Sequence, residues 1–185
     1  MTEHEQLVRL LADRSARRGQ FTLASGRQST LYIDARLTTM TPEGQRLIGR
    51  LGLAAIAAAP WEADAVGGLT LGADPIAYAI CHESADGARP IKSFTVRKEA
   101  KAHGTGKQVE GPLAAGDRVV IVEDVITTGA SAEKAVEAVQ RAGATVLGVL
   151  ALVDREEGGR EHLESRGLHV RALTTASEVV PHIKG

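Results

Sequence analysis

Residues 119–131 read VVIVEDVITTGAS, and they are the strongest indication of fold in the chain. The run from residue 118 to residue 122 is almost wholly apolar, which is typical of a strand buried on both faces of a parallel sheet. Two acids, Glu123 and Asp124, follow it. A short polar turn then leads to Ser131, which we predict to cap a helix. The stretch therefore predicts the first half of a unit in which a helix joins two parallel strands.

The same pattern extends in both directions along the chain. Thr41 and Pro42 mark the start of another helix, because a hydroxyl cap followed by proline is a common helix opening. Further strands are predicted at residues 65–69, 91–96, 145–153 and 169–173, and further helices at residues 75–83, 131–143 and 160–165. We therefore predict an α/β fold, a doubly wound parallel sheet with helices on both faces and a small N-terminal hood, in a single domain that spans residues 1–185.

The predicted hood begins with an amphipathic helix. Thr2 and Glu5 stand at capping-box spacing, and Gly19 is predicted to end the helix. Two short strands, at residues 21–23 and 31–34, are predicted on either side of a polar turn.

Composition excludes several classes of protein. The 185 residues carry a net charge of −1, whereas binding to nucleic acid or to a membrane surface needs a basic surplus, so we expect neither as a partner. Aromatic residues make up only 3%, which disfavours base stacking. The N-terminus has no uninterrupted apolar stretch, the histidines lack metal-ligand spacing, and a lone Cys81 indicates a reducing compartment. We expect a cytoplasmic protein.

Residues 123–131 combine two kinds of chemistry. Hydroxyls and backbone N–H groups from Thr127 to Ser131 can converge on a phosphate at a helix N-terminus, and Gly129 permits close approach. The acids Glu123 and Asp124 would repel a phosphate, so they should face hydroxyl groups. A sugar phosphate meets both demands. The alternative is an acidic strand end followed by an ordinary polar cap, while the glycine-rich nucleotide motifs G-x-x-x-x-G-K-[ST] and G-x-G-x-x-G do not occur.

Residues 97–112 show no apolar period, carry three glycines and are predicted to form a long loop. Between residues 97 and 107 four cations stand against the single acid Glu99. A mobile cationic segment suits a lid over an anion such as pyrophosphate, and the alternative is a solvated surface loop. The cations of this loop are Arg97, Lys98, Lys101 and Lys107.

The segment VVIVEDVITTGAS resembles the phosphoribosyl pyrophosphate signature of the type I phosphoribosyltransferases. Residues 21–36 (FTLASGRQSTLYIDAR), 97–104 (RKEAKAHG) and 152–161 (LVDREEGGRE) are similar to segments of the orotate-specific members of that family. The resemblance spans nearly the whole chain. It implies an enzyme of pyrimidine biosynthesis that transfers a 5-phosphoribosyl group from phosphoribosyl pyrophosphate to orotate, with Mg²⁺, to give orotidine 5'-phosphate and pyrophosphate.

The resemblance also implies roles for particular residues. Lys98, Lys101, His103 and Asp124 are implied in catalysis, and Thr127 and Arg155 in binding orotate. It further implies a homodimer in which Arg97, Lys101 and His103 serve the neighbouring subunit's site. The residues implied to bind phosphoribosyl pyrophosphate are Arg97, Lys98, Lys101, His103, Glu123, Asp124, Val125, Ile126, Thr127, Thr128, Gly129, Ala130 and Ser131.

Two rival functions remain open at this point, and the chain differs from some members of the family at two places. The rivals are a non-catalytic sensor of phosphoribosyl pyrophosphate and a phosphoribosyltransferase specific for purines. The basic loop argues against the sensor, because a sensor has no leaving group to stabilise, and Arg155 argues against the purine enzyme. The departures are Ala24, where some relatives carry lysine, and Leu71-Gly72, where some carry a Tyr-Lys pair. The alternative to orotate binding by Arg155 is a purely structural role, in an ion pair with Asp154 at the end of the strand.

Overall fold

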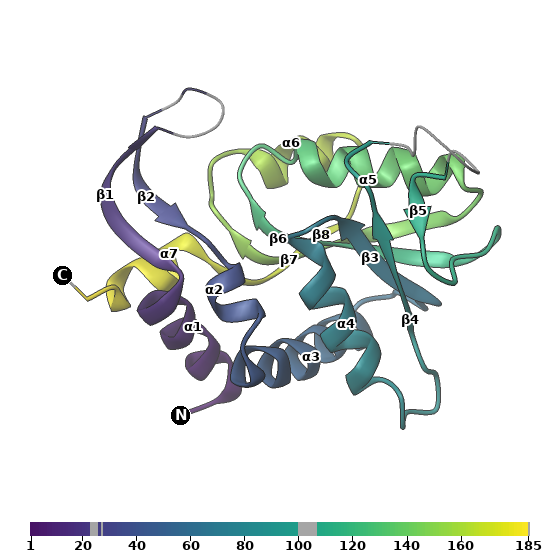
Figure 1. Ribbon diagram of the computed structural model, residues 1–185, viewed down its shortest axis with the longest axis horizontal. Coiled ribbons are helices and arrows are strands. Elements are labelled where there is room, and N and C mark those ends of the chain that lie inside the picture. Colours follow the sequence, from purple (N-terminus) through teal and green to yellow (C-terminus); the bar gives the residue numbers. More distant parts are fainter. Residues whose placement is uncertain (23–25, 27, 100–106, 185) are drawn as a thin grey trace.

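The computed structural model describes residues 1–22, 26, 28–99 and 107–184. Its centre is a six-stranded sheet in which β4 and β5 are antiparallel and every other neighbouring pair is parallel (Figure 1). The spatial order is β5 (Val109–Glu110), β4 (Lys92–Val96), β3 (Ala65–Leu69), β6 (Arg118–Ile126), β7 (Thr145–Asp154) and β8 (Val170–Thr175).

Helices cover both faces of this sheet. The helices α3 (Pro42–Ala57) and α4 (Ala73–Glu83) lie on one face, and α5 (Ala130–Arg141) and α6 (Gly159–Ser165) lie on the other (Figure 1). Alternate residues of β6 show the consequence: Val120 belongs to the core beneath α3 and α4, whereas Ile121 belongs to the core beneath α5. A strand points successive side chains to opposite faces, so the predicted doubly wound α/β fold is confirmed.

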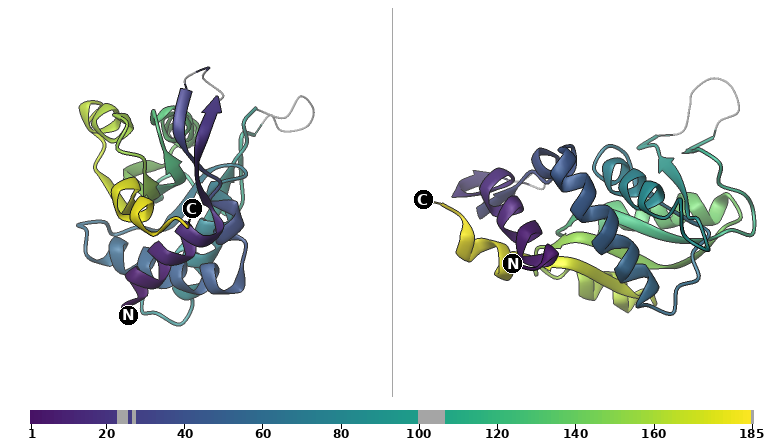
Figure 2. Two further views of the ribbon diagram at one scale, coloured as in Figure 1. Left: turned by 90° about the vertical axis from the view of Figure 1, so that its left-hand side faces the viewer. Right: turned by 90° about the horizontal axis from the view of Figure 1, so that it is seen from below.

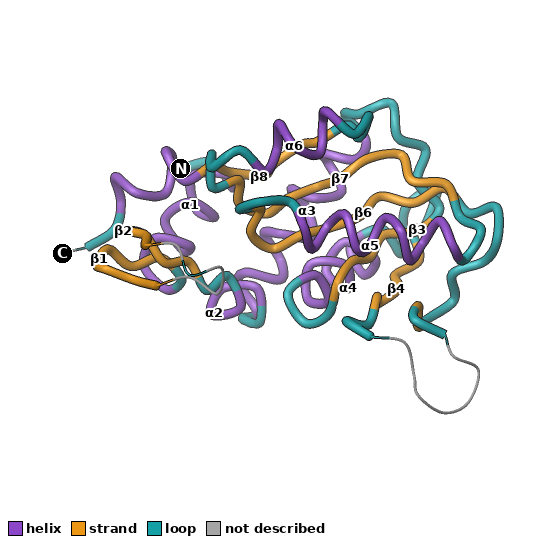
Figure 3. Tube along the Cα trace, turned by 90° about the horizontal axis from the view of Figure 1, so that it is seen from above, coloured by secondary structure: helices purple, strands orange, loops and turns teal. Residues whose placement is uncertain are grey.

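The hood consists of α1 (Glu3–Arg14), the antiparallel strands β1 (Ala16–Thr22) and β2 (Gln28–Ile33), and α2 (Arg36–Thr39). This hairpin stands beside one end of the sheet (Figure 3). The C-terminal segment completes the hood, because α7 (Ala176–Val179) and the 3-10 turn η1 (Val180–His182) lie against α1 (Figure 2). Arg18 Nη2 donates to the Val180 carbonyl at 3.0 Å, and the Lys184 ammonium lies 2.8 Å from Asp13.

The capping box of α1 forms as predicted, but Gly19 does not end the helix. That helix ends at Arg14, and Gly19 lies inside β1. The Ser15 hydroxyl is buried against the Thr38 hydroxyl at 2.7 Å, and pairing with β2 begins at the next residue, Ala16. Cross-strand pairing, which local periodicity does not contain, therefore sets this boundary.

Other predicted boundaries also shift. The hood strands span Ala16–Thr22 and Gln28–Ile33 instead of residues 21–23 and 31–34. The first helix after the acids begins at Ala130 with Gly129 as its N-cap, so Ser131 is not the cap. The preceding strand continues through Glu123 and Asp124 to Ile126 instead of ending at Val122, because its pairing with β7 continues to the Ile126↔Asp154 partners. The helix α4 starts at Ala73, before the predicted proline position, and the basic loop contains the short strand β5. The Thr41 cap of α3 is confirmed, since its hydroxyl accepts from Gly44 N at 3.1 Å.

Among the described residues, no helix combines the length and apolar character that a membrane crossing requires.

Asp64 fixes the amino ends of the two central strands. Its carboxylate accepts from Arg118 N at 2.9 Å and from Arg118 Nε at 3.1 Å, and Arg89 Nη2 donates to it at 3.0 Å. The hydrogen bonds from Arg118, first from its side chain and then from its backbone, hold the pKa of Asp64 well below its usual range.

Replacing this carboxylate should weaken the fold in a pH-dependent way. We expect Asp64→Asn to lower the free energy of unfolding at pH 7 by about 1–2 kcal/mol, because charge-assisted bonds are lost. A lowered folded-state pKa stabilises the native state above the unfolded pKa of about 3.9, and that stabilisation is lost progressively as the pH falls. Urea denaturation should therefore show that the difference in free energy of unfolding between the wild type and Asp64→Asn is smaller at acid pH than at pH 7. Asp86→Asn, which changes an exposed acid after α4, is the matched control. A difference that persists unchanged in acid contradicts the assignment.

Candidate functional site

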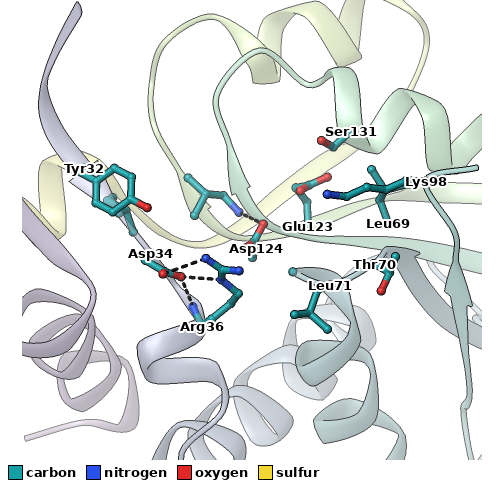
Figure 4. A pocket seen from close by; sticks show the side chains of 13 residues that line it. Tyr32, Asp34, Arg36, Leu69, Thr70, Leu71, Lys98, Glu123, Asp124 and Ser131 are labelled. Atoms are coloured by element: carbon teal, nitrogen blue, oxygen red, sulfur yellow. Dashed lines mark hydrogen bonds and ion pairs between the residues drawn. The ribbon is translucent and has the colours of Figure 1, made fainter. Parts of the chain in front are cut away.

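The strand order reverses between β3 and β6, since the chain goes from β3 outward to β4 on one side and from β6 to β7 on the other. Ligands of open α/β sheets bind outside the carboxyl ends of strands at such a reversal. An open cleft of about 280 Å³ lies there. Its lining comes from the hood, from the segments after β3 and β4, and from the end of β6 and the start of α5 (Figure 4). The lining residues are Tyr32, Ile33, Asp34, Arg36, Leu69, Thr70, Leu71, Gly72, Lys98, Glu123, Asp124, Val125 and Ser131.

The two predicted acids both line the cleft. Glu123 is only 8% exposed, and its Oε2 atom has no hydrogen-bond partner among the described residues. Burial, and then the charge of neighbouring Asp124, raise the pKa of Glu123 well above its usual value. Asp124 is half-buried and accepts from Val125 N at 2.9 Å. A buried acceptor with no partner is unfavourable by itself, so the pair fits a ligand that brings hydroxyl groups or a cation.

Gly72 makes room for one of these acids. A Cβ atom added at Gly72 would lie 2.4 Å from Asp124 Oδ2, which is far closer than two such atoms approach. The backbone at Gly72 has φ −63°, so the glycine is needed here for space and not for its conformation. The departure at Leu71-Gly72 thus has a structural meaning: glycine lets the segment after β3 pack directly against the carboxylate.

The hydroxyl-rich turn stands at the N-terminus of α5, as predicted. Gly129 adopts φ +83°, a conformation that glycine takes without strain, and the chain then enters the helix. Thr128, Ala130 and Ser131 are exposed and Thr127 is half-buried, so the turn is accessible to an anion. The two residues before the turn have different surroundings: Val125 lines the cleft, whereas the Ile126 side chain is buried in the core. Only the backbone of Ile126 can face a ligand.

The basic loop is described only in part. Lys98 is exposed and lines the cleft from the side of β4 (Figure 4). Arg97 lies at the base of the loop, where its Nε donates to Glu110 of β5 at 2.9 Å. Lys107 is exposed. Lys101 and His103 lie outside the described residues, as does Ala24.

Arg155 is buried at the carboxyl end of β7 and is not part of the cleft lining. Its Nη2 donates to the Ser29 hydroxyl at 3.1 Å and to the Glu157 carboxylate, and its buried Nε has no partner among the described residues. Its ion-pair partner is Glu157 and not Asp154, whose carboxylate accepts from Glu156 N at 2.8 Å and lies 3.9 Å from Arg160 Nη1. Arg155 therefore joins the sheet to the hood beside the cleft.

Two hood residues that line the cleft, Asp34 and Arg36, are not among the site residues predicted from the sequence. Arg36 binds Asp34 through two bonds, Nε to Oδ1 at 2.8 Å and Nη2 to Oδ2 at 3.0 Å (Figure 4). Asp34, and to a smaller extent Asp124, raise the pKa of Arg36 above its usual value. Arg36 thus brings a cation to the acidic side of the cleft. The residues next to Arg36 do not by themselves indicate this role, because the packing of α2 against α3 and α4 places Arg36 there.

Comparisons with known proteins agree with the geometry. The phosphoribosyl transferase domain model matches residues 40–175. A protein of Aquifex aeolicus named orotate phosphoribosyltransferase is 48% identical over 183 residues, which are 97% of this chain and 99% of that protein. The crystal structure of Mycobacterium tuberculosis H37Rv orotate phosphoribosyltransferase in complex with Fe(III) dicitrate has a TM-score of 0.84 at 43% identity, covering 96% of this chain and 99% of that one. The complex of that enzyme with 5-phospho-alpha-D-ribosyl 1-diphosphate has a TM-score of 0.81 at 40% identity, covering 97% and 99%.

The contact between Gly72 and Asp124 can be tested with one methyl group. We expect Gly72→Ala to keep the fold, because the backbone conformation suits alanine, and to push the Asp124 carboxylate out of place. Calorimetric titration with phosphoribosyl pyrophosphate should show binding weakened by about tenfold or more. Thermal melting of the same variant serves as the control. Unchanged affinity would mean that Asp124 does not face this ligand.

Proposed function

The chain belongs to the phosphoribosyltransferase family, in which it is an orotate phosphoribosyltransferase, and from this premise we propose that the cleft between β3 and β6 is its active site. The enzyme transfers a 5-phosphoribosyl group from phosphoribosyl pyrophosphate to orotate in pyrimidine biosynthesis and releases pyrophosphate. The observation that carries the site assignment is the pair of acids at the end of β6, the buried Glu123 and the half-buried Asp124, next to the glycine turn at the N-terminus of α5.

The acids and the turn suit the two ends of the ribose 5'-phosphate. In this assignment Glu123 and Asp124 take the ribose hydroxyls, and the backbone and hydroxyls of the turn take the 5'-phosphate. Displacement at the anomeric carbon develops positive charge on the ribose, and a neighbouring carboxylate stabilises that charge. Catalysis is then mainly positioning and charge stabilisation, with no covalent step on the protein.

The residues of the cleft fit a magnesium ion held largely by substrate oxygens. The described residues contain no group of three or more His, Cys, Asp or Glu side chains that could hold a metal by themselves. Mg²⁺ commonly binds through one or two carboxylates together with substrate phosphates, and the half-buried Asp124 carboxylate in the cleft lining matches that mode. We expect Asp124 and the substrate to hold it. When bound, Mg²⁺ offsets negative charge on the pyrophosphate.

The pyrophosphate leaves toward the cationic side of the cleft. Lys98 lines that side in its own subunit, and in the proposed homodimer Arg97, Lys101 and His103 of the partner subunit complete it. Cations placed where the leaving group gains charge lower the barrier to its departure, and a histidine can donate a proton to it. Arg36 adds a further cation on the hood side of the cleft. It supplies positive charge in a chain that has Ala24 and Gly72 where some relatives carry lysine.

Orotate brings a planar carboxylate, and a guanidinium is its natural partner. In this proposal Arg155 and Thr127 bind the base. Arg155 already contacts Ser29 of the hood, so the same side chain would bind orotate and hold the hood in place.

We also propose that the protein is a homodimer with sites shared between subunits, formed by a single domain over residues 1–185. Exposed large apolar side chains support the dimer: Leu37 on α2, Met40 directly after it, Leu71 just before α4 and Tyr78 on α4 are each about half exposed. Burying such side chains against a second copy of the chain would be favourable. We place the enzyme in the cytoplasm, because a chain with one cysteine cannot form an intrachain disulfide.

The deciding experiment for activity is the loss of orotate absorbance with phosphoribosyl pyrophosphate and Mg²⁺, run beside hypoxanthine, adenine and uracil. Turnover of orotate alone is expected. Turnover of a purine would contradict the base assignment, and tight binding of phosphoribosyl pyrophosphate with no turnover of any base would favour the sensor.

Arg155 can be tested by separating the two substrates. We expect Arg155→Ala to raise the KM for orotate by about tenfold or more, with a smaller change for phosphoribosyl pyrophosphate, because only orotate loses a carboxylate partner. Arg155→Lys keeps the charge without the planar fork and should fall between the wild type and the alanine variant. Equal effects on both substrates would assign Arg155 to structure.

Mixing two inactive variants tests the shared site. Lys101→Ala damages the loop that serves the neighbour, and Asp124→Asn damages the subunit's own site. With free exchange of equal amounts, about half the dimers are mixed and each has one intact site, so activity should approach about a quarter of wild type. If exchange is demonstrated and the mixture is no more active than its parents, the loop serves its own subunit.

A further inference from the structure

The segment between β3 and α4 forms one wall of the cleft. Thr70, Leu71 and Gly72 line it, and Gly72 packs against Asp124. This wall must be held in place, because a shift of about 1 Å in a substrate-positioning group can cost a factor of 10² in rate. The residue that holds it lies in the first turn of α4.

That residue is Asp74. It is only 7% exposed and it does not cap the helix, since the N-cap is Gly72. Its carboxylate instead receives two hydroxyl bonds from different elements. The Thr70 hydroxyl donates to Oδ2 at 2.7 Å, and the Thr95 hydroxyl donates to Oδ1 at 2.8 Å. One buried carboxylate thus joins the wall of the cleft to β4.

The position of β4 matters because Lys98 is the second residue after its last residue, Val96. Thr70 N also donates to the Val96 carbonyl at 2.8 Å, so backbone and side chain fasten the same two segments together. Asp74 lies at the N-terminus of an 11-residue helix, where the helix dipole favours a negative charge. Its two hydroxyl partners offset the cost of burying it.

We propose that Asp74 is a positioning residue for the pyrophosphate side of the active site. It fixes the distance between the Thr70–Gly72 wall, which packs against Asp124, and the end of β4, which leads to Lys98. The proposal rests on the proposed function for the identity of the ligand. Asp74 itself is not part of the cleft lining, so it acts through Thr70 and Thr95.

The test compares Asp74→Ala with a matched variant at the far end of the same helix. Ser84 is buried, and its hydroxyl accepts from Ile91 N at 2.9 Å, so Ser84→Ala also removes a contact between α4 and the segment leading to β4. We expect Asp74→Ala to raise the KM for phosphoribosyl pyrophosphate by about tenfold or more, with a smaller change for orotate. Ser84→Ala should lower only the melting temperature.

Two further variants separate geometry from charge. Asp74→Asn keeps the shape and can bond both hydroxyls, so it should stay within about threefold of wild type. The double variant Thr70→Val/Thr95→Val removes both donors and should reproduce the loss seen in Asp74→Ala, and it remains informative if that variant does not fold. The proposal is overturned if Asp74→Ala matches Ser84→Ala in its kinetics, if Asp74→Asn is as impaired as Asp74→Ala, or if the double valine variant binds normally.

Calorimetric titration with phosphoribosyl pyrophosphate alone keeps this proposal distinct from the proposed function. If the wild type fails to convert orotate, the proposed function is wrong. The affinity of the Asp74 series for phosphoribosyl pyrophosphate still shows whether Asp74 positions the wall.

Discussion

The parallel pairing of β3 with β6 is the contact on which the rest of the molecule depends. Through the partners Ala65↔Val119, Val66↔Val120 and Gly67↔Ile121, it places two strands from different parts of the chain side by side with their carboxyl ends together. A Cβ atom at Gly68 would lie 2.1 Å from the Val122 carbonyl, so the approach requires glycine. The segment after β3 and the acids of β6 meet only because this pairing forms, and the cleft lies where they meet.

Charge is then arranged around that meeting point. Glu123 is buried beside Asp124, and two neighbouring carboxylates in a poorly solvated place repel each other. Arg36 from the hood and Lys98 from the end of β4 stand on the surrounding walls of the same cleft. A ligand that carries both hydroxyls and phosphates can pair with both sets of residues, because its hydroxyls can donate to the acids and its phosphates can bind the cations. The electrostatics of the cleft therefore favour a sugar phosphate over a simple anion or a simple cation.

The walls of the cleft belong to separate elements, and a few buried polar contacts fasten them. Asp74 joins the segment after β3 to β4, and Arg155 joins the end of β7 to Ser29 in the hood. The hood is itself fastened at its base by the C-terminal segment, since Arg18 bonds the Val180 carbonyl. Polar contacts inside a protein fix geometry more sharply than apolar packing, because they depend on direction as well as distance.

The amino-acid sequence by itself determined those features whose free energy is local. The apolar strand, the two acids, the glycine turn and the start of the following helix occupy residues 119–131, so neighbouring residues suffice to specify them, as they do for the Thr41 cap. Only the tertiary structure decided where β1 begins, how far β6 continues and which side chains surround Glu123. Arg36, Gly72 and Asp74 take part because strands and helices far apart in the chain pack together. Their positions depend on burial and on cross-strand pairing. The free energy of these interactions comes from contacts between distant segments, so the local sequence pattern does not predict them.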